Sequence, residues 1–522
     1  MKNNDPAANG RVPPGGPAPS AGDGFDAEGG LPTLEPAPAR PAADAAPSSR
    51  PQVALQRLLE TGQATIGVVG LGYVGLPLAV EFARKGFRTV GIDVSTERVL
   101  RLNAGQSYIG DVPDEALRAV VEAGTLVAED GFASGADVDV FFICVPTPVT
   151  VYKDPDTSYI EAAARAVAEH LRAGQLVVLK STTYPNTTEG LVQPILAAAA
   201  AERGLQLGRD YFLAFSPERV DPGNAVYTTA NTPVVVGGVT RACGELAALA
   251  MRQVVEHVHF VSSPKVAEME KLLENIYRSV NIALVNELAR LCDRMGNVSI
   301  WEVVEAAATK PFGFMPFFPG PGLGGHCIPI DPYYLSWVAR RYDFETSFIT
   351  LSAQVNEGMP FYVTETVVRA IAQEGVRLRD ARVLVLGAAF KRDVDDVRHS
   401  PSLRLMGLLH ERGVGEVAYS DPYVPRLRVD TDGAEALELE SVPLTEEALA
   451  RYDVVVVATD HSAFAYDFIA EHARAIVDTR NALKHVRHDR DKIILLGGGA
   501  PPSERRHSNG HDVQAAPAAA LP

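Results

Sequence analysis

The chain alternates short apolar runs with amphipathic stretches over most of its length. Apolar residues recur at helical spacing over residues 116–123 and from Tyr159 to Leu171. Between such stretches stand apolar runs with the length and residue types of buried strands: TIGVVG, TVGID, VFFICVPTP, QLVVLKST, YFLAFSPE and VVVGG. This alternation predicts a doubly wound parallel sheet in the first half of the chain.

The pattern changes near Ser263 into one long amphipathic helix. The run KVAEMEKLLENIYRSVNIALVNELARLCDRM keeps helical spacing as far as Met295, and SIWEVVEAAAT predicts a second helix after it. At about 1.5 Å per residue, the first helix is longer than a small domain is wide. We therefore expect a spine between two domains and a surface through which subunits dimerise.

Strands and helices alternate again from about Ala381. The predicted strands are ARVLVLGAAF, EVAYSDPY, DVVVVATDH, AIVDTRN and KIILLGG, with SPSLRLMGLLHERG as a helix. The two ends of the chain, residues 1–50 and 500–522, are rich in Pro, Ala and Gly and predict disordered tails. The fold class is α/β, with two Rossmann-like doubly wound domains joined by a long central helix and a small helical domain. The expected domains are residues 51–262, 263–378 and 379–499.

Composition agrees with a large soluble enzyme. The chain has 522 residues, enough for two or three domains, and 46% of them are hydrophobic. Four scattered cysteines predict neither a disulfide framework nor a metal site, and they favour a reducing cytoplasm. The net charge of −17 argues against nucleic-acid or acidic-membrane partners. We find no run near the roughly 20 apolar residues of a membrane span and no signal peptide.

A glycine-rich turn follows the first predicted strand. Gly70, Gly72 and Gly75 have GxGxxG spacing, in which the first glycine makes the turn, the second admits a pyrophosphate and the third lets helix pack on strand. Asp93 ends the next strand, where an acid binds the adenosine ribose, and no arginine follows it directly. These residues predict NAD as the cofactor in preference to NADP. The unit after Ala381 lacks a complete GxGxxG, so we expect a different ligand there.

A second glycine-rich segment, PGPGLGGHCIPIDPY, contains Cys327. A thiolate attacks carbonyl carbon, and open backbone around it admits substrate and turns amide groups toward an oxyanion. The glycines at 320, 322, 324 and 325 would permit that approach. The alternative is a Gly/Pro surface loop with an incidental thiol.

Together these segments resemble the nucleotide-sugar 6-dehydrogenases, the family that includes UDP-glucose and GDP-mannose dehydrogenases. The resemblance covers about residues 65–495. Its subgroup oxidising UDP-N-acetylhexosamines is the most similar, as judged from SPERVDPGN, TKPFGF and GGHCIPIDPYYL. The family motifs are GLGYVGLP at 70–77, VPTP at 145–148, KSTTYP at 180–185, SPER at 216–219, KLLEN at 271–275, GPGLGGHCIPIDP at 320–332 and FKRDVDDVRHSP at 390–401.

The resemblance implies a four-electron oxidation of the C6 hydroxyl to a uronic acid, through a thiohemiacetal and a thioester on Cys327. It implies that Lys271 stabilises oxyanions and that Asn275 holds water or substrate. Asp331 and Thr182 would orient a water, and Glu218 would assist hydrolysis as a base. Without the family motifs, Lys271 and Asn275 would read as a solvated helix stripe, and Thr182 and Glu218 as ordinary loop residues.

The resemblance also implies two sets of binding residues. The predicted cofactor contacts are Gly70, Gly72, Tyr73, Val74, Gly75, Asp93, Arg98, Val145, Pro146, Thr147, Thr182 and Arg398. The predicted substrate contacts are Glu218, Arg219, Lys271, Asn275, Gly322, Gly324, Lys391 and Arg480.

Two departures bear on the sugar. Ile330 stands where many UDP-glucose dehydrogenases have a lysine, and Pro222 where many have an acid. Both favour an N-acetylated sugar, with UDP-N-acetylglucosamine expected and UDP-glucose, UDP-N-acetylgalactosamine or UDP-N-acetylmannosamine as alternatives. Two further interpretations stay open. The first is a two-electron β-hydroxyacid dehydrogenase, which would have no use for Cys327. The second is a catalytically silent nucleotide-sugar sensor, which would not explain the presence of the thiol, the lysine and the aspartate.

Overall fold

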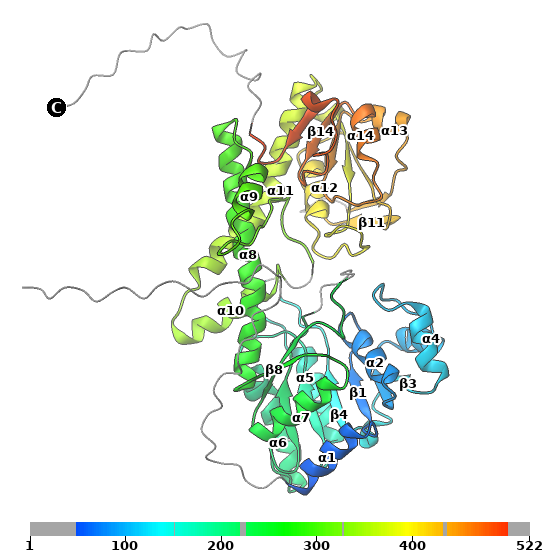
Figure 1. Ribbon diagram of the computed structural model, residues 1–522. Helices are drawn as coiled ribbons and strands as arrows, with labels where there is room; N and C mark the ends of the chain where they lie inside the picture. Colours follow the sequence, from blue (N-terminus) through cyan, green and yellow to red (C-terminus); the bar gives the residue numbers. More distant parts are fainter. Residues whose placement is uncertain (1–48, 151, 220–225, 326–327, 432–435, 500–522) are drawn as a thin grey trace, which may run out of the picture.

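The computed structural model describes residues 49–150, 152–219, 226–325, 328–431 and 436–499. Two α/β domains lie at opposite ends of the molecule, and the long helix α8 (Pro264–Met295) runs between them (Figure 1). This confirms the predicted fold class. The predicted tails lie outside the described residues, except for Ser49, which caps helix α1 (Arg50–Glu60), and Arg50, which begins it.

The first domain contains an eight-stranded sheet in the order β3-β2-β1-β4-β5-β6-β7-β8. All its neighbouring strands are parallel except β6 and β7, which pair antiparallel, so the expectation of a wholly parallel sheet is wrong at one step. Each apolar run predicted as a strand in this half of the chain is one, whereas β3 and β8 were not foreseen. The bounds are β1 Ile66–Val69, β2 Thr89–Ile92, β3 Leu126–Glu129, β4 Val140–Ile143, β5 Leu176–Leu179, β6 Phe212–Phe215, β7 Val234–Gly238 and β8 Val258–Val261.

Helices cover both faces of this sheet. Apolar residues of α1, α2, α3, α4 and α7 share one buried cluster with the sheet, and those of α5 and α6 share another. The sheet is therefore buried on both sides, which explains why its strands are almost wholly apolar. The bounds are α2 Gly75–Arg84, α3 Thr96–Asn103, α4 Asp114–Glu122, η1 Gly135–Asp137, α5 Ser158–Glu169, η2 Thr188–Val192, α6 Gln193–Glu202 and α7 Arg241–Arg252.

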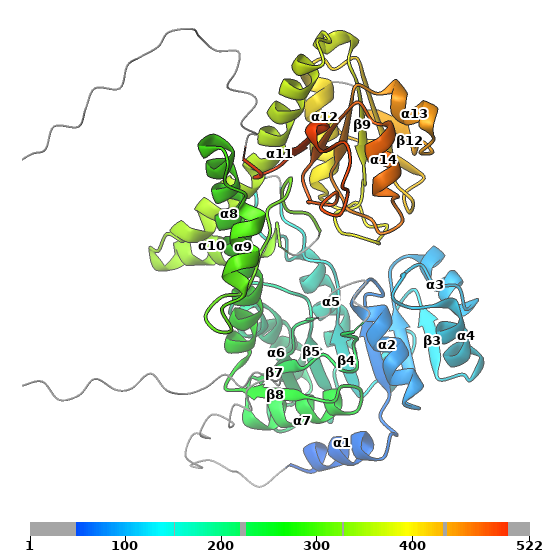
Figure 2. The ribbon, with the colours of Figure 1, turned by 45° about the horizontal axis from the view of Figure 1, so that its top comes forward.

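The helical part is built on α8, the predicted spine. Helix α11 packs along it, and buried amide groups join the two helices: Asn286 Nδ2 donates to Asn356 Oδ1 at 3.0 Å, and Asn356 Nδ2 donates to the Ser279 carbonyl at 3.0 Å. In Figure 2, α8 and α9 cross the middle of the molecule and α10 projects from them. The other bounds are α9 Ile300–Ala308, α10 Asp331–Ala339, η3 Arg340–Tyr342 and α11 Ser347–Gln373.

The second domain has a parallel five-stranded sheet in the order β10-β9-β13-β14-β15. A short antiparallel hairpin, β11 with β12, is added to it and was not foreseen. The chain then returns to the helical part, where Trp301 Nε1 of α9 donates to the Leu496 carbonyl at 2.7 Å. The bounds are η4 Leu378–Asp380, β9 Arg382–Leu386, α12 Pro401–Glu411, β10 Glu416–Ser420, β11 Arg426–Val429, β12 Leu437–Glu440, α13 Glu446–Arg451, β13 Val454–Val457, α14 Tyr466–His472, β14 Ala475–Asp478, η5 Arg490–Lys492 and β15 Ile493–Leu495. No helix among the described residues is long and apolar enough to span a bilayer.

Candidate active site

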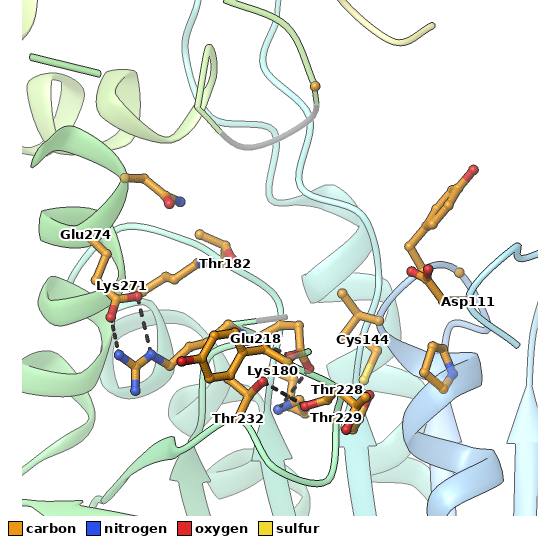
Figure 3. Close-up of a pocket in the computed structure, with 18 of the residues that line it drawn as sticks. Asp111, Cys144, Lys180, Thr182, Glu218, Thr228, Thr229, Thr232, Lys271 and Glu274 are labelled. Carbon is orange, nitrogen blue, oxygen red and sulfur yellow. Dashed lines mark hydrogen bonds and ion pairs between the residues drawn. The ribbon is translucent and has the colours of Figure 1, made fainter. Parts of the chain in front are cut away.

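A cavity of about 2420 Å³ opens between the first domain, the spine helix and the first loop of the second domain. Most of the predicted site residues line it, and Figure 3 shows Lys271, Thr182 and Glu218 around it. Four predicted residues do not line it: Gly75, Gly322, Lys391 and Arg480. Cys327, together with His326, lies outside the described residues. The lining residues predicted from the sequence are Gly70, Gly72, Tyr73, Val74, Asp93, Arg98, Val145, Pro146, Thr147, Thr182, Glu218, Arg219, Lys271, Asn275, Gly324, Asp331 and Arg398.

The three glycines of the first turn have different surroundings. Gly70 has a φ of +91°, and a Cβ on Gly75 would lie 1.8 Å from the Gly70 carbonyl oxygen, so both positions need glycine. A Cβ on Gly72 would meet nothing within 4 Å. Open space at the second glycine, before the N-terminus of α2, is what a pyrophosphate requires, so these residues fit the predicted dinucleotide.

The Asp93 carboxylate forms hydrogen bonds with the backbone of the glycine turn and of its own loop. Its Oδ2 accepts from the Leu71 N–H at 2.9 Å and its Oδ1 from the Ser95 N–H at 2.9 Å, while Arg98 lies 3.5 Å from Oδ2. Asp93 is buried but lines the cavity. It lies at the carboxyl end of β2, where sequence analysis predicted a ribose ligand.

The loops after β4 and β5 are joined to each other and to helix α10. Thr147 Oγ1 donates to the Thr182 carbonyl at 2.7 Å, and Ser181 Oγ donates to the Val145 carbonyl at 2.7 Å. The buried Tyr334 hydroxyl of α10 donates to the Thr147 carbonyl. The predicted cofactor loop is thus fixed against the helix that begins with Asp331.

Lys271, Asn275 and Asp331 come together where α8 meets the start of α10. Asn275 Nδ2 donates to Asp331 Oδ2 at 2.5 Å. Asp331 is 2% exposed, and burial raises its pKa to about 7, although Lys271 and the Asn275 bond act in the opposite direction. A carboxyl group that titrates near neutral pH beside a lysine and an amide can accept or return a proton.

Glu218, in the loop after β6, pairs with Lys180 at the end of β5. The Lys180 Nζ lies 3.4 Å from Glu218 Oε2, and the lysine is 1% exposed. This lysine opens the family motif KSTTYP, and no role was predicted for it from the sequence. The available signal was a charged residue placed directly after the apolar run QLVVL.

Arg219 was predicted to bind substrate, but protein groups surround it. Its guanidinium pairs with Glu274 of α8, lies 3.6 Å from Glu270 and donates to the Pro233 carbonyl at 2.9 Å. Burial raises the pKa of Glu270 to about 7, with the neighbouring Glu274 acting in the same direction. Both glutamates flank Lys271 on the helix, so Arg219 ties the turn that bears this lysine to the first domain.

The glycines before Cys327 pack against the second domain. A Cβ on Gly320 would lie 2.8 Å from Arg480 Nη1, and one on Gly324 would lie 2.5 Å from the Phe390 Cβ. The Gly325 N–H donates to the Arg398 carbonyl at 3.0 Å. This backbone lies against the second domain, and Gly324 and Gly325 also line the cavity, where open backbone for substrate is expected.

Arg398 spans the gap between the two domains. Its guanidinium lies 4.4 Å from the ring centroid of Tyr73 in the glycine turn, and it pairs with Asp396 at 2.6 Å. Arg480 donates through Nε to the Ala458 carbonyl at 3.0 Å, and its burial lowers its pKa. Lys391 is part of the same loop as Arg398 but stands away from the cavity wall. The described residues contain no group of three His, Cys, Asp or Glu side chains arranged to hold a metal ion.

Three family descriptions match the chain in succession. These are the UDP-glucose/GDP-mannose dehydrogenase family NAD binding domain over residues 64–258, the central domain over 265–358 and the UDP binding domain over 384–485. The first match includes the glycine turn, and the second includes Lys271 and the glycine loop. The predictions of NAD and of a different ligand for the second domain are therefore confirmed at the level of the family.

Individual proteins give the same result. A UDP-N-acetyl-D-mannosamine dehydrogenase of Pyrococcus horikoshii is 36% identical over 80% of this chain and 96% of its own length. A UDP-N-acetyl-D-glucosamine 6-dehydrogenase of Salmonella typhi is 35% identical over 77% and 91%. The solved structure of the Pyrococcus horikoshii UDP-D-ManNAc dehydrogenase superposes with a TM-score of 0.73 at 33% identity, covering 83% of this chain and 99% of that one. The chain belongs to the UDP-glucose/GDP-mannose dehydrogenase family, and it is an NAD-dependent nucleotide-sugar dehydrogenase.

Proposed function

We propose that this protein oxidises the C6 hydroxyl of a UDP-N-acetylhexosamine, UDP-N-acetylglucosamine first among them, to the uronic acid. The product would serve as a precursor of surface polysaccharide. The single observation that supports this most is the shared cavity, which joins a dinucleotide turn to Lys271, Asn275 and Asp331. Relatives named for N-acetylglucosamine, N-acetylmannosamine and N-acetylgalactosaminuronic acid stand at 34 to 36% identity, which supports the class of sugar and leaves its stereochemistry to experiment.

The proposed chemistry needs a nucleophile that keeps the aldehyde bound between two hydride transfers. We assign this role to Cys327 from the sequence; Gly325 and Ile328, on either side of residues 326 and 327, line the cavity. The thiolate adds to the aldehyde carbon, a second hydride leaves that carbon and a thioester results. Water then adds to the thioester, the C–S bond breaks and the thiolate is regenerated.

The remaining groups handle charge and protons. The Lys271 ammonium stabilises the negative oxygen that develops at C6. Asp331, with its pKa near 7, accepts the proton of the alcohol and later orients water with Thr182. The chain would hold NAD through the Gly70–Gly75 turn, Asp93, Val145–Thr147 and Arg398, and the bound cofactor would supply the hydride acceptor.

We also propose that two subunits associate through α8. One face of this helix presents large apolar side chains to solvent, whereas the residues on the opposite side are buried in the protein. A second copy of the chain would bury them, and light scattering of the purified protein would give the number of subunits. The exposed side chains are Val266, Met269, Leu273, Tyr277, Leu284, Leu291 and Met295.

A substrate panel tests the proposal. Purified protein is mixed with NAD and each UDP-sugar in turn, and NADH formation and product mass are recorded. The expected result is two NADH per UDP-N-acetylhexosamine and a uronic acid product. One NADH per molecule of a β-hydroxyacid would identify the two-electron alternative, and binding without turnover would identify a sensor. Cys327→Ser should abolish acid formation while NAD and UDP-sugar still bind, since a hydroxyl is a much weaker nucleophile at neutral pH.

A further inference from the structure

Lys180 is a charged side chain in an unusual place. It follows the buried strand β5, is 1% exposed and reaches the wall of the cavity (Figure 3). Its ammonium group lies 3.4 Å from Glu218 Oε2 and 3.4 Å from the Pro217 carbonyl oxygen. An ammonium group buried to this degree requires a compensating charge.

Cys144 is also an ionisable neighbour of Lys180, and it supplies no such charge. Burial raises the pKa of its thiol to about 12, despite the attraction of Lys180, so its sulfur stays protonated at neutral pH. Within the part of the chain that the structure describes, Lys180 forms its ion pair with Glu218. The pair is asymmetric, because the Glu218 side chain keeps 15% exposure and the Lys180 side chain keeps 1%.

A contribution to folding stability does not explain why Lys180 and Glu218 form a buried pair. A buried ion pair costs two desolvations, and an apolar residue of the same volume is often as stabilising. A fixed positive charge behind a carboxylate does have a chemical effect, because it favours the ionised form of that carboxylate and holds it in one orientation.

We propose that Lys180 is a positioning residue that keeps Glu218 ionised and directed at the cavity, where Glu218 takes a proton from the water that hydrolyses the thioester. In that step the water oxygen bonds to the carbonyl carbon, its proton goes to Glu218, the C–S bond breaks and sulfur leaves as thiolate. The inference rests on the proposed function. It assigns Glu218 to the hydrolysis of the thioester and gives it no part in the two hydride transfers.

Rapid mixing tests the role. Lys180→Met, Glu218→Gln and the double variant are each mixed with NAD and UDP-N-acetylglucosamine, and NADH absorbance is followed. We expect Lys180→Met to show a burst of about two NADH per subunit at the parent rate, then a steady state at least about 10-fold slower. The double variant should be no slower than Glu218→Gln alone, because the two residues act on one step.

A matched control is Lys265→Met. Lys265 also pairs with a glutamate, Glu189, at 3.3 Å, but its side chain is half exposed and does not line the cavity. It should show no burst and the parent steady state. Equal slowing of the first turnover and the steady state in Lys180→Met, or losses that multiply in the double variant, would overturn the proposal.

A measurement without turnover separates this inference from the proposed function. Infrared difference spectra against Glu218→Gln report the pH at which the Glu218 carboxylate takes up a proton. That pH should rise by about one unit or more in Lys180→Met, and an unchanged pH would overturn the proposal. If the parent protein is inactive on every UDP-sugar, the proposed function is refuted. The titration of Glu218 still tests the role of Lys180 in that case. If neither Lys180→Met nor Lys180→Gln folds, Lys180 is structural and the proposal fails.

Discussion

The two α/β units share a glycine turn after their first strand and an aspartate after the strand beside it, but the aspartate has different surroundings in each unit. In the first, β1 leads to Gly70 with a φ of +91°, and Asp93 follows β2. In the second, β9 leads to Gly387 with a φ of +85°, and Asp421 follows β10. Each acid accepts an N–H from just after its glycine, Leu71 at 2.9 Å in the first unit and Ala388 at 2.7 Å in the second.

The units diverge after the glycine. Helix α2 starts at Gly75, close enough for its N-terminus to face a phosphate, whereas α12 starts at Pro401, after the loop that holds Arg398. Asp421 also accepts from the N–H groups of Tyr423 and Val424 and from His461 Nε2 at 3.0 Å. Its carboxylate is occupied by its own domain, and its side chain has no exposed surface. A glycine turn and an acid at a strand end are therefore insufficient to define a dinucleotide site.

The largest effect should come from Asp421→Ala. The change leaves several buried N–H groups and His461 without an acceptor, so the free energy of unfolding should fall by about 3 kcal/mol or more. Chemical denaturation followed by tryptophan fluorescence measures it. The KM for NAD should stay at the parent value in the fraction that folds. A variant as stable as the parent would show that the second acid is free to bind a ligand.

Lys271→Ala tests whether α8, the helix between the two units, supplies a catalytic side chain. Loss of one oxyanion donor should lower kcat by about 10²-fold or more, with a much smaller change in KM. Steady-state kinetics with UDP-N-acetylglucosamine measures both. Lys265→Met on the same helix is the control. A kcat within about twofold of the parent, in a folded protein, would remove Lys271 from the site.

Asp93→Ala is the counterpart of the first change and should affect cofactor binding. We expect the KM for NAD to rise about 10-fold and the preference over NADP to narrow, because the carboxylate both binds ribose hydroxyls and repels a 2′-phosphate. The ratio of kcat/KM for the two cofactors measures this. An unchanged ratio of kcat/KM for NAD and NADP would mean that Asp93, like Asp421, only binds the backbone of its own turn and does not contact the cofactor.

The smallest effect concerns pH. Asp331 must be ionised to accept a proton, so kcat should rise with pH through about 7, where its pKa lies. Asn275→Ala removes a hydrogen bond that lowers this pKa, so the rise should move to higher pH by less than about one unit. Because folding raises the pKa of Asp331, its contribution to stability is present at acid pH and is lost as pH rises through about 7. A profile flat between about pH 6 and pH 8 would contradict this role.

Much of the fold could be read from the sequence, since buried strands are continuous apolar runs and the α8 pattern lasts for many turns. Strand β3 was missed because only two of its four residues, Leu126 and Ala128, are buried. The reversed β7 was not foreseen, as strand direction leaves no mark on hydrophobicity. In the site, Arg219 is paired by Glu274, 55 positions away, and contacts of that range follow from packing alone. The burial that shifts the pKa of Asp331 likewise depends on the folded chain.

The bond from the Gly325 N–H to the Arg398 carbonyl has a consequence for how this protein can be recombined. The segment before Cys327 is fitted to Phe390, Arg398 and Arg480, all of them in the second domain. A chimaera that takes its UDP binding domain from a relative would therefore place different side chains against residues 320–325. Exchange of specificity by domain swapping should succeed only when residues 320–325 are transplanted with that domain.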